Sequence, residues 1–210
     1  MDALEHTLRG TRTALLVVDV QNDYCDQKGS LAAAGLDVSG VASMMPRLHR
    51  LIESAHRAGV PVVFIQTIHD ASTDTPAWRD RAQGRMRAVC RPGTWGSQFH
   101  QVCPAVGDTV VNKYRYSAFI KTKLELVLHA MGVETLVLAG VATNVCVEST
   151  ARDACMLDYR VVLARDACAS FTPAAHEMAV ENIQNYFGLA ASVADITSVW
   201  RQSAAARAAS

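Results

Sequence analysis

The stretch Glu134-Thr-Leu-Val-Leu-Ala-Gly-Val-Ala-Thr-Asn-Val-Cys-Val-Glu-Ser-Thr-Ala-Arg-Asp153 decides the fold. Residues 136–139 are a short aliphatic run, typical of a parallel strand that is buried on both faces. Gly140 and a polar turn follow this run, and small and apolar residues then recur at helical spacing. The stretch therefore predicts a strand, a tight turn and a helix that packs closely on a parallel sheet.

Cys146 falls in the first turn of this predicted helix, for which Thr143 or Asn144 can serve as the N-cap. Backbone N–H groups in a first turn lack partners within the helix, and the helix dipole there is positive. We therefore expect a lowered pKa for the Cys146 thiol and N–H groups that could hold an oxyanion. A buried structural cysteine is the alternative, and position alone does not decide between them.

Composition limits the classes of protein that the chain can belong to. It has 210 residues, half of them hydrophobic, which is enough for one sizeable core. Twenty basic and twenty acidic side chains balance exactly to zero formal charge, which argues against a nucleic-acid or membrane-surface partner. The apolar run at residues 14–18 is too short for a signal core or a membrane span, so a cytoplasmic protein is expected. The six cysteines show no C-x-x-C pair and are expected to be free thiols.

Strand and helix patterns alternate along the chain. Further strands are expected at residues 13–18, 60–67, 108–112, 160–164 and 191–196, and further helices at residues 41–58, 121–131 and 173–187. This alternation predicts an α/β fold, a single-domain three-layer α/β/α sandwich with a six-stranded, mainly parallel sheet, over residues 13–200.

The remaining segments are expected to lie outside this regular pattern. Residues 1–12 are predicted to form a loosely held N-terminal arm, and residues 201–210 a flexible tail. Residues 68–108 are rich in glycine and proline, which favours a lid or binding region. The arginines in this region fit either a patch for an anionic partner or a solvated or subunit-contact face, and the zero net charge favours the second; they are Arg79, Arg81, Arg85, Arg87 and Arg91.

Three polar residues stand at or just beyond the ends of predicted strands: Asp19, Lys113 and Cys146. The chain has no G-x-G-x-x-G, no phosphate-binding G-x-x-x-x-G-K-[ST] and no G-x-S-x-G. If the three strands lie near one another, the three side chains converge. A carboxylate can then take the thiol proton, and an ammonium beside both can favour the thiolate.

The chain resembles the isochorismatase-like cysteine hydrolases from about residue 13 to residue 196. The resemblance rests on Leu15-Leu-Val-Val-Asp-Val-Gln-Asn-Asp23, on Asn112-Lys-Tyr-Arg-Tyr-Ser-Ala-Phe119 and on Gly140-Val-Ala-Thr-Asn-Val-Cys-Val147. It implies that Asp19, Lys113 and Cys146 form a catalytic triad. It also implies a cis peptide before Ala142, whose N–H would form an oxyanion hole with that of Cys146.

Within this superfamily, the motifs look most like those of ureidoacrylate amidohydrolases and relatives that act on biuret, triuret or N-carbamoyl compounds. The resemblance therefore implies hydrolysis of a C–N bond in a small amide or ureido substrate through a covalent Cys146 intermediate. Nicotinamidase-type or other small-amide hydrolysis is the alternative, and a catalytically silent interaction domain is a further one. Adjacency to the motifs suggests the following substrate contacts: Gln21, Tyr24, His69, Tyr116, Ser117 and Phe119.

Nicotinamidases carry a metal-binding D-x-H and a further histidine after the second strand. Here that place reads Gln66-Thr-Ile-His-Asp70, without D-x-H and without a second histidine nearby. We therefore expect no metal and no cofactor. The expected partners are a small-molecule substrate and further copies of the chain in a dimer or tetramer.

Overall fold

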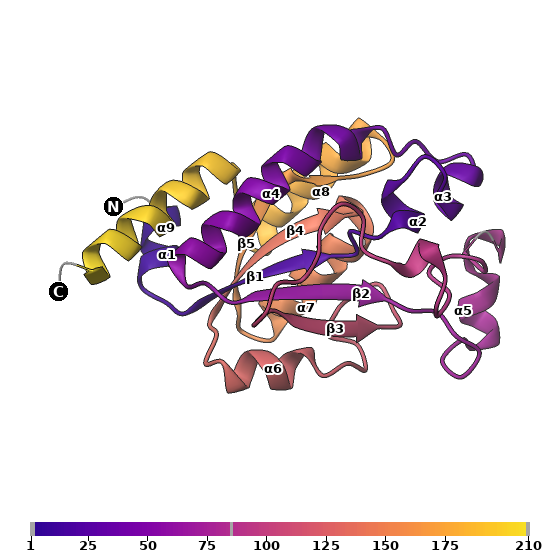
Figure 1. Ribbon diagram of the computed structural model, residues 1–210, viewed down its shortest axis with the longest axis horizontal. Helices are drawn as coiled ribbons and strands as arrows, with labels where there is room; N and C mark the ends of the chain where they lie inside the picture. The colour runs from indigo at the N-terminus through magenta and orange to yellow at the C-terminus, as the bar shows by residue number, and fades with distance from the viewer. Residues whose placement is uncertain (1–2, 85, 209–210) are drawn as a thin grey trace.

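The structure is a computed structural model that describes residues 3–84 and 86–208 (Figure 1). Residues 1–2 and 209–210 of the predicted arm and tail, and Arg85 of the arginine-rich segment, lie outside the described residues. No helix among the described residues is both long enough and apolar enough to cross a bilayer.

Six parallel strands form one sheet in the order β3-β2-β1-β4-β5-β6. The strands are β1 (Thr13–Val18), β2 (Val62–Thr67), β3 (Thr109–Lys113), β4 (Thr135–Val141), β5 (Arg160–Ala169) and β6 (Leu189–Ala191). β1 and β4 are buried at every position, which explains the apolar runs that follow the first threonine of each strand. The predicted α/β fold is confirmed, and the sheet is parallel throughout.

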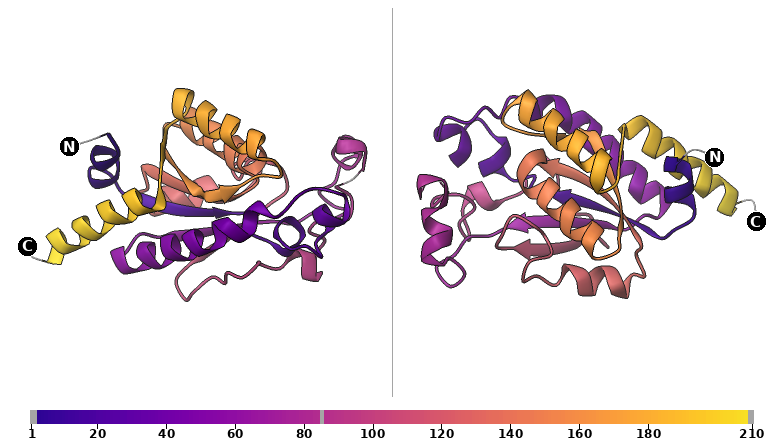
Figure 2. Two further views of the ribbon diagram at one scale, coloured as in Figure 1. Left: turned by 90° about the horizontal axis from the view of Figure 1, so that it is seen from above. Right: turned by 180° about the vertical axis from the view of Figure 1, so that it is seen from behind.

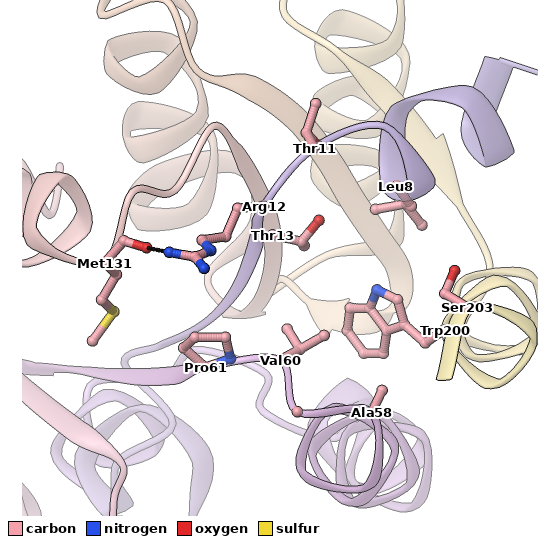
Figure 3. A pocket seen from close by; sticks show the side chains of 11 residues that line it. Leu8, Thr11, Arg12, Thr13, Ala58, Val60, Pro61, Met131, Trp200 and Ser203 are labelled. Atoms are coloured by element: carbon pink, nitrogen blue, oxygen red, sulfur yellow. Dashed lines mark hydrogen bonds between the residues drawn. The ribbon is translucent and has the colours of Figure 1, made fainter. Parts of the chain in front are cut away.

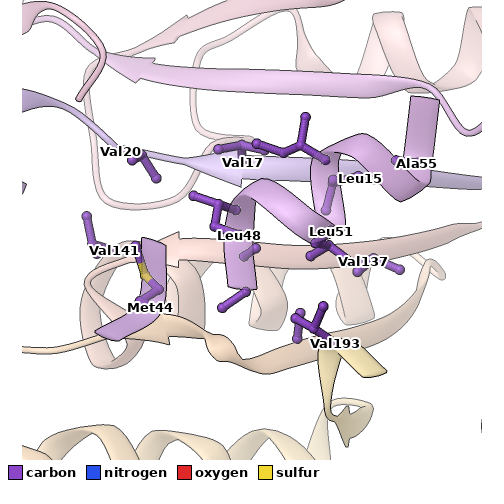
Figure 4. Close-up of a cluster of buried hydrophobic side chains, with 14 of the residues drawn as sticks. Leu15, Val17, Val20, Met44, Leu48, Leu51, Ala55, Val137, Val141 and Val193 are labelled. Atoms are coloured by element: carbon purple, nitrogen blue, oxygen red, sulfur yellow. The ribbon is translucent and has the colours of Figure 1, made fainter. Parts of the chain in front are cut away.

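Helices cover both faces of the sheet (Figures 1 and 2). One face packs against α4 (Gly40–Ala58) and α9 (Val193–Ala208), and the other against α6 (Leu124–Ala130), α7 (Glu148–Met156) and α8 (Pro173–Tyr186). Met44, Leu48 and Leu51 of α4 lie against side chains of β1 and β4 (Figure 4). Each such buried side chain contributes roughly 1.5–3 kcal/mol of hydrophobic stabilisation.

The terminal segments differ from the expectation of loose ends. Helix α1 (Ala3–Arg9) buries Leu8 in the core and packs against α9, and α9 continues as far as Ala208. The predicted strand at residues 191–196 is wrong beyond its first residue, because β6 ends at Ala191 and α9 begins at Val193. Val193 and Ile196 therefore bury their side chains from a helix, where the sequence suggested strand alternation.

Short helices occupy the connections at the carboxyl ends of the strands. They are α2 (Asn22–Cys25), α3 (Ser30–Ala33), α5 (Pro76–Asp80), η1 (Arg81–Gly84), η2 (Trp95–Ser97) and the π-helical turn η3 (Thr143–Val147). Most of them lie in the glycine- and proline-rich connections, and α5 and η1 project beyond the end of the sheet (Figure 1).

Gly140 allows β4 to run close to β1 at this end of the sheet. Its φ is 121°, and a Cβ atom at this position would overlap the backbone of Val18, its partner in the strand ladder. Glycine is therefore required where β4 leads into the turn before Cys146.

A pocket of about 530 Å³ lies at the opposite, amino ends of the strands, between α1, α9 and the start of β1 (Figure 3). Leu8, Thr13, Pro61 and Trp200 are among its lining residues. None of the three candidate catalytic residues lines it.

Candidate active site

Asp19, Lys113 and Cys146 converge beyond the carboxyl ends of the strands. The Lys113 Nζ atom lies 2.7 Å from Asp19 Oδ2 and 3.5 Å from Cys146 Sγ. All three residues are buried, with exposed fractions of 0% for Asp19, 1% for Lys113 and 5% for Cys146. Parallel strands end at a common edge, and this geometry brings together residues that are far apart in the sequence.

Thr67, the last residue of β2, is a part of the site that the sequence reasoning missed. Strand β2 lies between β1 and β3, and Thr67 pairs with Lys113 in the strand register. The Thr67 hydroxyl donates a hydrogen bond of 2.8 Å to Asp19 Oδ1. Lys113 Nζ also donates to the Arg115 carbonyl at 2.9 Å. The carboxylate and the ammonium are thus both held in place, and the position of Thr67 at a strand end was the available signal.

The backbone at Cys146 forms a π-helical turn before α7, which differs from the predicted first turn of an α-helix. Thr143 and Asn144 do not cap this turn, because their side chains bond elsewhere: Thr143 Oγ1 to His176 Nδ1, and Asn144 Oδ1 to the Ser170 hydroxyl. The N–H groups of Val145 and Val147 instead donate to the Ala142 carbonyl at 3.0 and 3.2 Å.

Ala142, the residue before the π-helical turn, has a buried N–H group. The Val141–Ala142 peptide is cis, as the resemblance implied, and the Ala142 residue is 4% exposed. Within residues 3–84 and 86–208, this N–H donates no hydrogen bond. Buried backbone donors are rarely left unpaired, so a group with this geometry is a candidate donor to a reaction intermediate.

The pKa of the Cys146 thiol is raised to about 12, chiefly by burial. The Lys113 ammonium lowers this pKa, whereas the Asp19 charge and a hydrogen bond from the thiol to Asp19 raise it. The predicted lowering of the Cys146 pKa is therefore wrong, because burial and the carboxylate outweigh the ammonium. Burial also lowers the pKa of Lys113, but the negative charge of Asp19 and contact with Cys146 raise it overall. The resting site thus combines an Asp19–Lys113 ion pair with a neutral thiol.

Tyr24 and His69 lie beside this triad. Burial raises the pKa of Tyr24 well above its usual value, and the charge of Asp19 adds to the effect. Burial, together with the positive charges of Arg81 and Lys113, lowers the pKa of His69 to about 4 against the opposing effect of Asp74. Both side chains are therefore neutral near pH 7.

The other predicted substrate contacts lie at different places. Tyr116 packs against Trp78 in a tilted arrangement, with ring centroids 4.9 Å apart, and Ser117 is buried and accepts a hydrogen bond from the Phe119 N–H. Phe119 itself packs against Tyr159, the residue before β5, at the amino end of the strands. The structure therefore does not bring Phe119 to the triad.

Gln21 is fully buried and bonded to backbone groups through both ends of its amide. Its Nε2 donates to the carbonyls of Thr67 and Ser97, and its Oε1 accepts from the Thr67 N–H. These bonds tie the segment that follows β1 to the end of β2. Gln21 thus fixes the backbone around the site, and both ends of its amide are used in these bonds.

No group of three or more His, Cys, Asp or Glu side chains in the described part of the chain could hold a metal ion. The reactive groups that the site does bring together are the Cys146 thiol, the Asp19 carboxylate and the Lys113 ammonium. Such a set can form and break a covalent bond between sulfur and a carbonyl carbon.

Comparison with known proteins gives matches over nearly the whole chain. The model of the isochorismatase domain matches residues 13–195. The ureidoacrylate amidohydrolase RutB of Agrobacterium fabrum is 35% identical over 217 aligned positions, which cover 94% of this chain and 94% of that protein.

Solved structures show the same fold. A cysteine hydrolase from Pseudomonas syringae pv. phaseolicola has a TM-score of 0.83 and 27% identity, covering 91% of this chain and 93% of the other. The N-carbamoylsarcosine amidase of Thermoplasma acidophilum has a TM-score of 0.71 and 28% identity, covering 87% of this chain and 96% of the other.

Proposed function

The chain belongs to the isochorismatase family, and on this premise we propose that it is a cysteine amidohydrolase that cleaves the C–N bond of a ureido group through Cys146. The observation that carries the proposal is the position of Lys113 Nζ, 2.7 Å from the Asp19 carboxylate and 3.5 Å from the Cys146 sulfur. This contact joins a nucleophile, a proton acceptor and a fixed positive charge in one buried site.

The first half of the reaction transfers the thiol proton and forms a C–S bond. Asp19 takes the proton of Cys146 as the sulfur attacks the ureido carbonyl carbon, and the C=O electron pair moves onto oxygen. The N–H groups of Ala142 and Cys146 hold that oxyanion. When the oxyanion collapses, the C–N bond breaks and Asp19 returns the proton to the departing amine or ammonia.

The second half restores the enzyme. Water attacks the carbonyl carbon of the acylated Cys146 while Asp19 takes a proton from it, and the C–S bond breaks. The same proton then returns to the sulfur. Lys113 stays charged throughout, because its pKa is raised in the presence of Asp19, and it stabilises the sulfur whenever the sulfur carries negative charge.

The neutral resting thiol fits this mechanism. A thiol with a pKa of about 12 is protonated near pH 7, so proton transfer to Asp19 has to accompany the attack on the carbonyl. This arrangement limits reaction of Cys146 with electrophiles that do not occupy the site correctly.

The relatives support a carbamoyl compound as the substrate. The names of two of them specify ureidoacrylate and N-carbamoylsarcosine, and both compounds contain a ureido carbonyl. The candidates for this chain are ureidoacrylate, biuret, triuret and N-carbamoyl compounds. A role in pyrimidine breakdown, a cytoplasmic location and a dimeric or tetrameric assembly remain predictions from the sequence.

A substrate panel tests the proposal. Ureidoacrylate, biuret, triuret, N-carbamoyl amino acids and nicotinamide are incubated with the protein, and each product is quantified by mass spectrometry. We expect turnover of at least one ureido compound and none by Cys146→Ala, in which binding persists. Turnover of nicotinamide alone, or equal turnover by Cys146→Ala, would contradict the proposal.

A further inference from the structure

We propose that Arg81 binds a carboxylate group of the substrate, so that the protein selects an anionic ureido acid over a neutral compound such as biuret or triuret. This inference rests on the proposed function, because it concerns the far end of the substrate whose ureido group reacts at Cys146. It assigns to Arg81 a role in specificity that the arginine-rich sequence alone did not favour.

Arg81 is linked through His69 to the strand end that carries Lys113. Thr67 pairs with Lys113 in the strand register, the Ile68 N–H donates to the Lys113 carbonyl at 3.0 Å, and His69 is the next residue. On the other side, His69 Nε2 is 3.3 Å from Arg81 Nη2. Arg81 is therefore connected to the nucleophile Cys146 through two intervening residues, His69 and Lys113.

Two aromatic rings support this guanidinium. Its Cζ lies 3.6 Å from the centroid of the Trp78 ring and 5.7 Å from that of Tyr116. Arg81 Nη1 also donates to the Trp78 carbonyl. A cation over an aromatic face is held by the ring quadrupole and loses freedom, which prepares its planar donors for a ligand.

The charges near Arg81 are unbalanced. Asp74 is the acidic group of this cluster, and it makes a 2.6 Å ion pair with Arg91. Arg115 lies 4.6 Å from the Trp78 ring centroid, and it donates to the carbonyls of Tyr114 and Thr73. Within the described residues, neither Arg81 nor Arg115 makes an ion pair with a carboxylate. His69 adds no charge near pH 7, since burial lowers its pKa to about 4.

Arg81 also has a buried donor without a partner. Its Nε is shielded from solvent and makes no hydrogen bond to any residue in the described ranges. An unpaired buried donor on a charged group is costly, and a carboxylate is the anion that matches the planar fork of a guanidinium. Ureidoacrylate and N-carbamoyl amino acids carry a carboxylate, whereas biuret and triuret do not.

The neighbouring arginines differ from Arg81 and provide a control. Arg79 is exposed, and Arg87 pairs with Asp80 at 2.6 Å on the surface. The solvated face expected from the sequence therefore describes these two residues, but not Arg81. Arg79→Gln makes the same change of charge two positions away on the same segment.

The test compares each acid with its own neutral amide. Ureidoacrylate and N-carbamoyl-β-alanine are each assayed beside the corresponding primary amide, and loss of the ureido group is followed by mass spectrometry. We expect wild-type kcat/KM to favour the acids by on the order of 100-fold. Arg81→Gln should raise KM for the acids by about the same factor and leave kcat and the amides nearly unchanged. Arg81→Lys should fall between the two, and Arg79→Gln should match the wild type.

Binding to the inactive Cys146→Ala variant, measured by calorimetry, separates this inference from the proposed function. Tight binding of the acids that weakens with Arg81→Gln supports the role of Arg81 even if no ureido compound is turned over. Equal use of acid and amide by the wild type would overturn the inference and leave the amidohydrolase intact. Equal losses for acid and amide in Arg81→Gln, or no binding of the acids to Cys146→Ala, would overturn it as well.

Discussion

Replacing Asp19 with asparagine should change the reactivity of Cys146 and the turnover of the enzyme in opposite directions. Burial raises the pKa of the Cys146 thiol to about 12, and Asp19 contributes to this by its charge and its hydrogen bond. Such a thiol is almost entirely protonated near pH 7.5. Cys146 of the wild type should therefore react slowly with iodoacetamide.

The expected size of the effect follows from the Lys113 contact. At 3.5 Å between Nζ and Sγ, an effective dielectric constant of about 20 gives an attraction of about 5 kcal/mol, or about 3.5 pKa units. Asp19 offsets much of this attraction in the wild type. Asp19→Asn removes this opposing negative charge with little change in side-chain shape. The pKa of the Cys146 thiol should then fall by up to about 3 units, and its alkylation rate should rise by on the order of 100-fold.

Turnover of the same variant should fall by about 1000-fold or more, because no carboxylate remains to take the thiol proton and return it to the leaving nitrogen. Alkylation of the Cys146 peptide is measured by mass spectrometry across a range of pH, with the exposed Cys103 as the internal reference. Lys113→Met should shift alkylation the other way, since the thiolate then loses its counter-charge. Unchanged or slower alkylation in Asp19→Asn would refute this electrostatic reasoning.

Three further predictions concern Thr67, Gly140 and the need for a metal ion. Thr67→Val removes the hydroxyl that donates to Asp19 Oδ1, and steady-state assays should show kcat lowered about 10-fold. Thr67→Ser should recover this activity. Full activity in Thr67→Val would show that this bond does not position the carboxylate. Gly140→Ala places a Cβ against the Val18 backbone, and thermal unfolding should show a loss of about 3 kcal/mol or more, whereas an unchanged Tm would contradict the close approach of β4 to β1. Prolonged chelation should leave kcat unchanged, and a loss restored by zinc or manganese would indicate a metal-dependent reaction.

The sheet and the convergence of Asp19, Lys113 and Cys146 were predictable because they depend on local patterns. Apolar runs followed by Asp19, Lys113 and the turn before Cys146 mark strand ends, and parallel strands place those ends at one edge. Val193 illustrates the limit of this approach, since a short apolar stretch is compatible with both a strand and a buried helix.

The environment of individual side chains was not predictable from the sequence. The pKa of Cys146 depends on how completely the site is buried and on the competition between Asp19 and Lys113. Gln21 and Phe119 were expected to contact the substrate because they adjoin the family motifs in sequence. Gln21 instead bonds backbone groups, and Phe119 packs at the amino ends of the strands. Thr67 could have been suspected from its place at a strand end, but its hydrogen bond to Asp19 and the contact of Arg81 with His69 join separate segments, which no local pattern specifies.

Acid quenching during turnover, followed by mass spectrometry of the Cys146 peptide, tests the central claim most directly. With a ureido substrate, we predict a covalent adduct on Cys146 that is absent from the other five cysteines. A carbamoyl adduct indicates that the substituted amine leaves first, and an adduct of the substrate less ammonia indicates that ammonia leaves first. Turnover at full rate without an adduct on Cys146, or with one that persists unhydrolysed, would contradict the covalent mechanism.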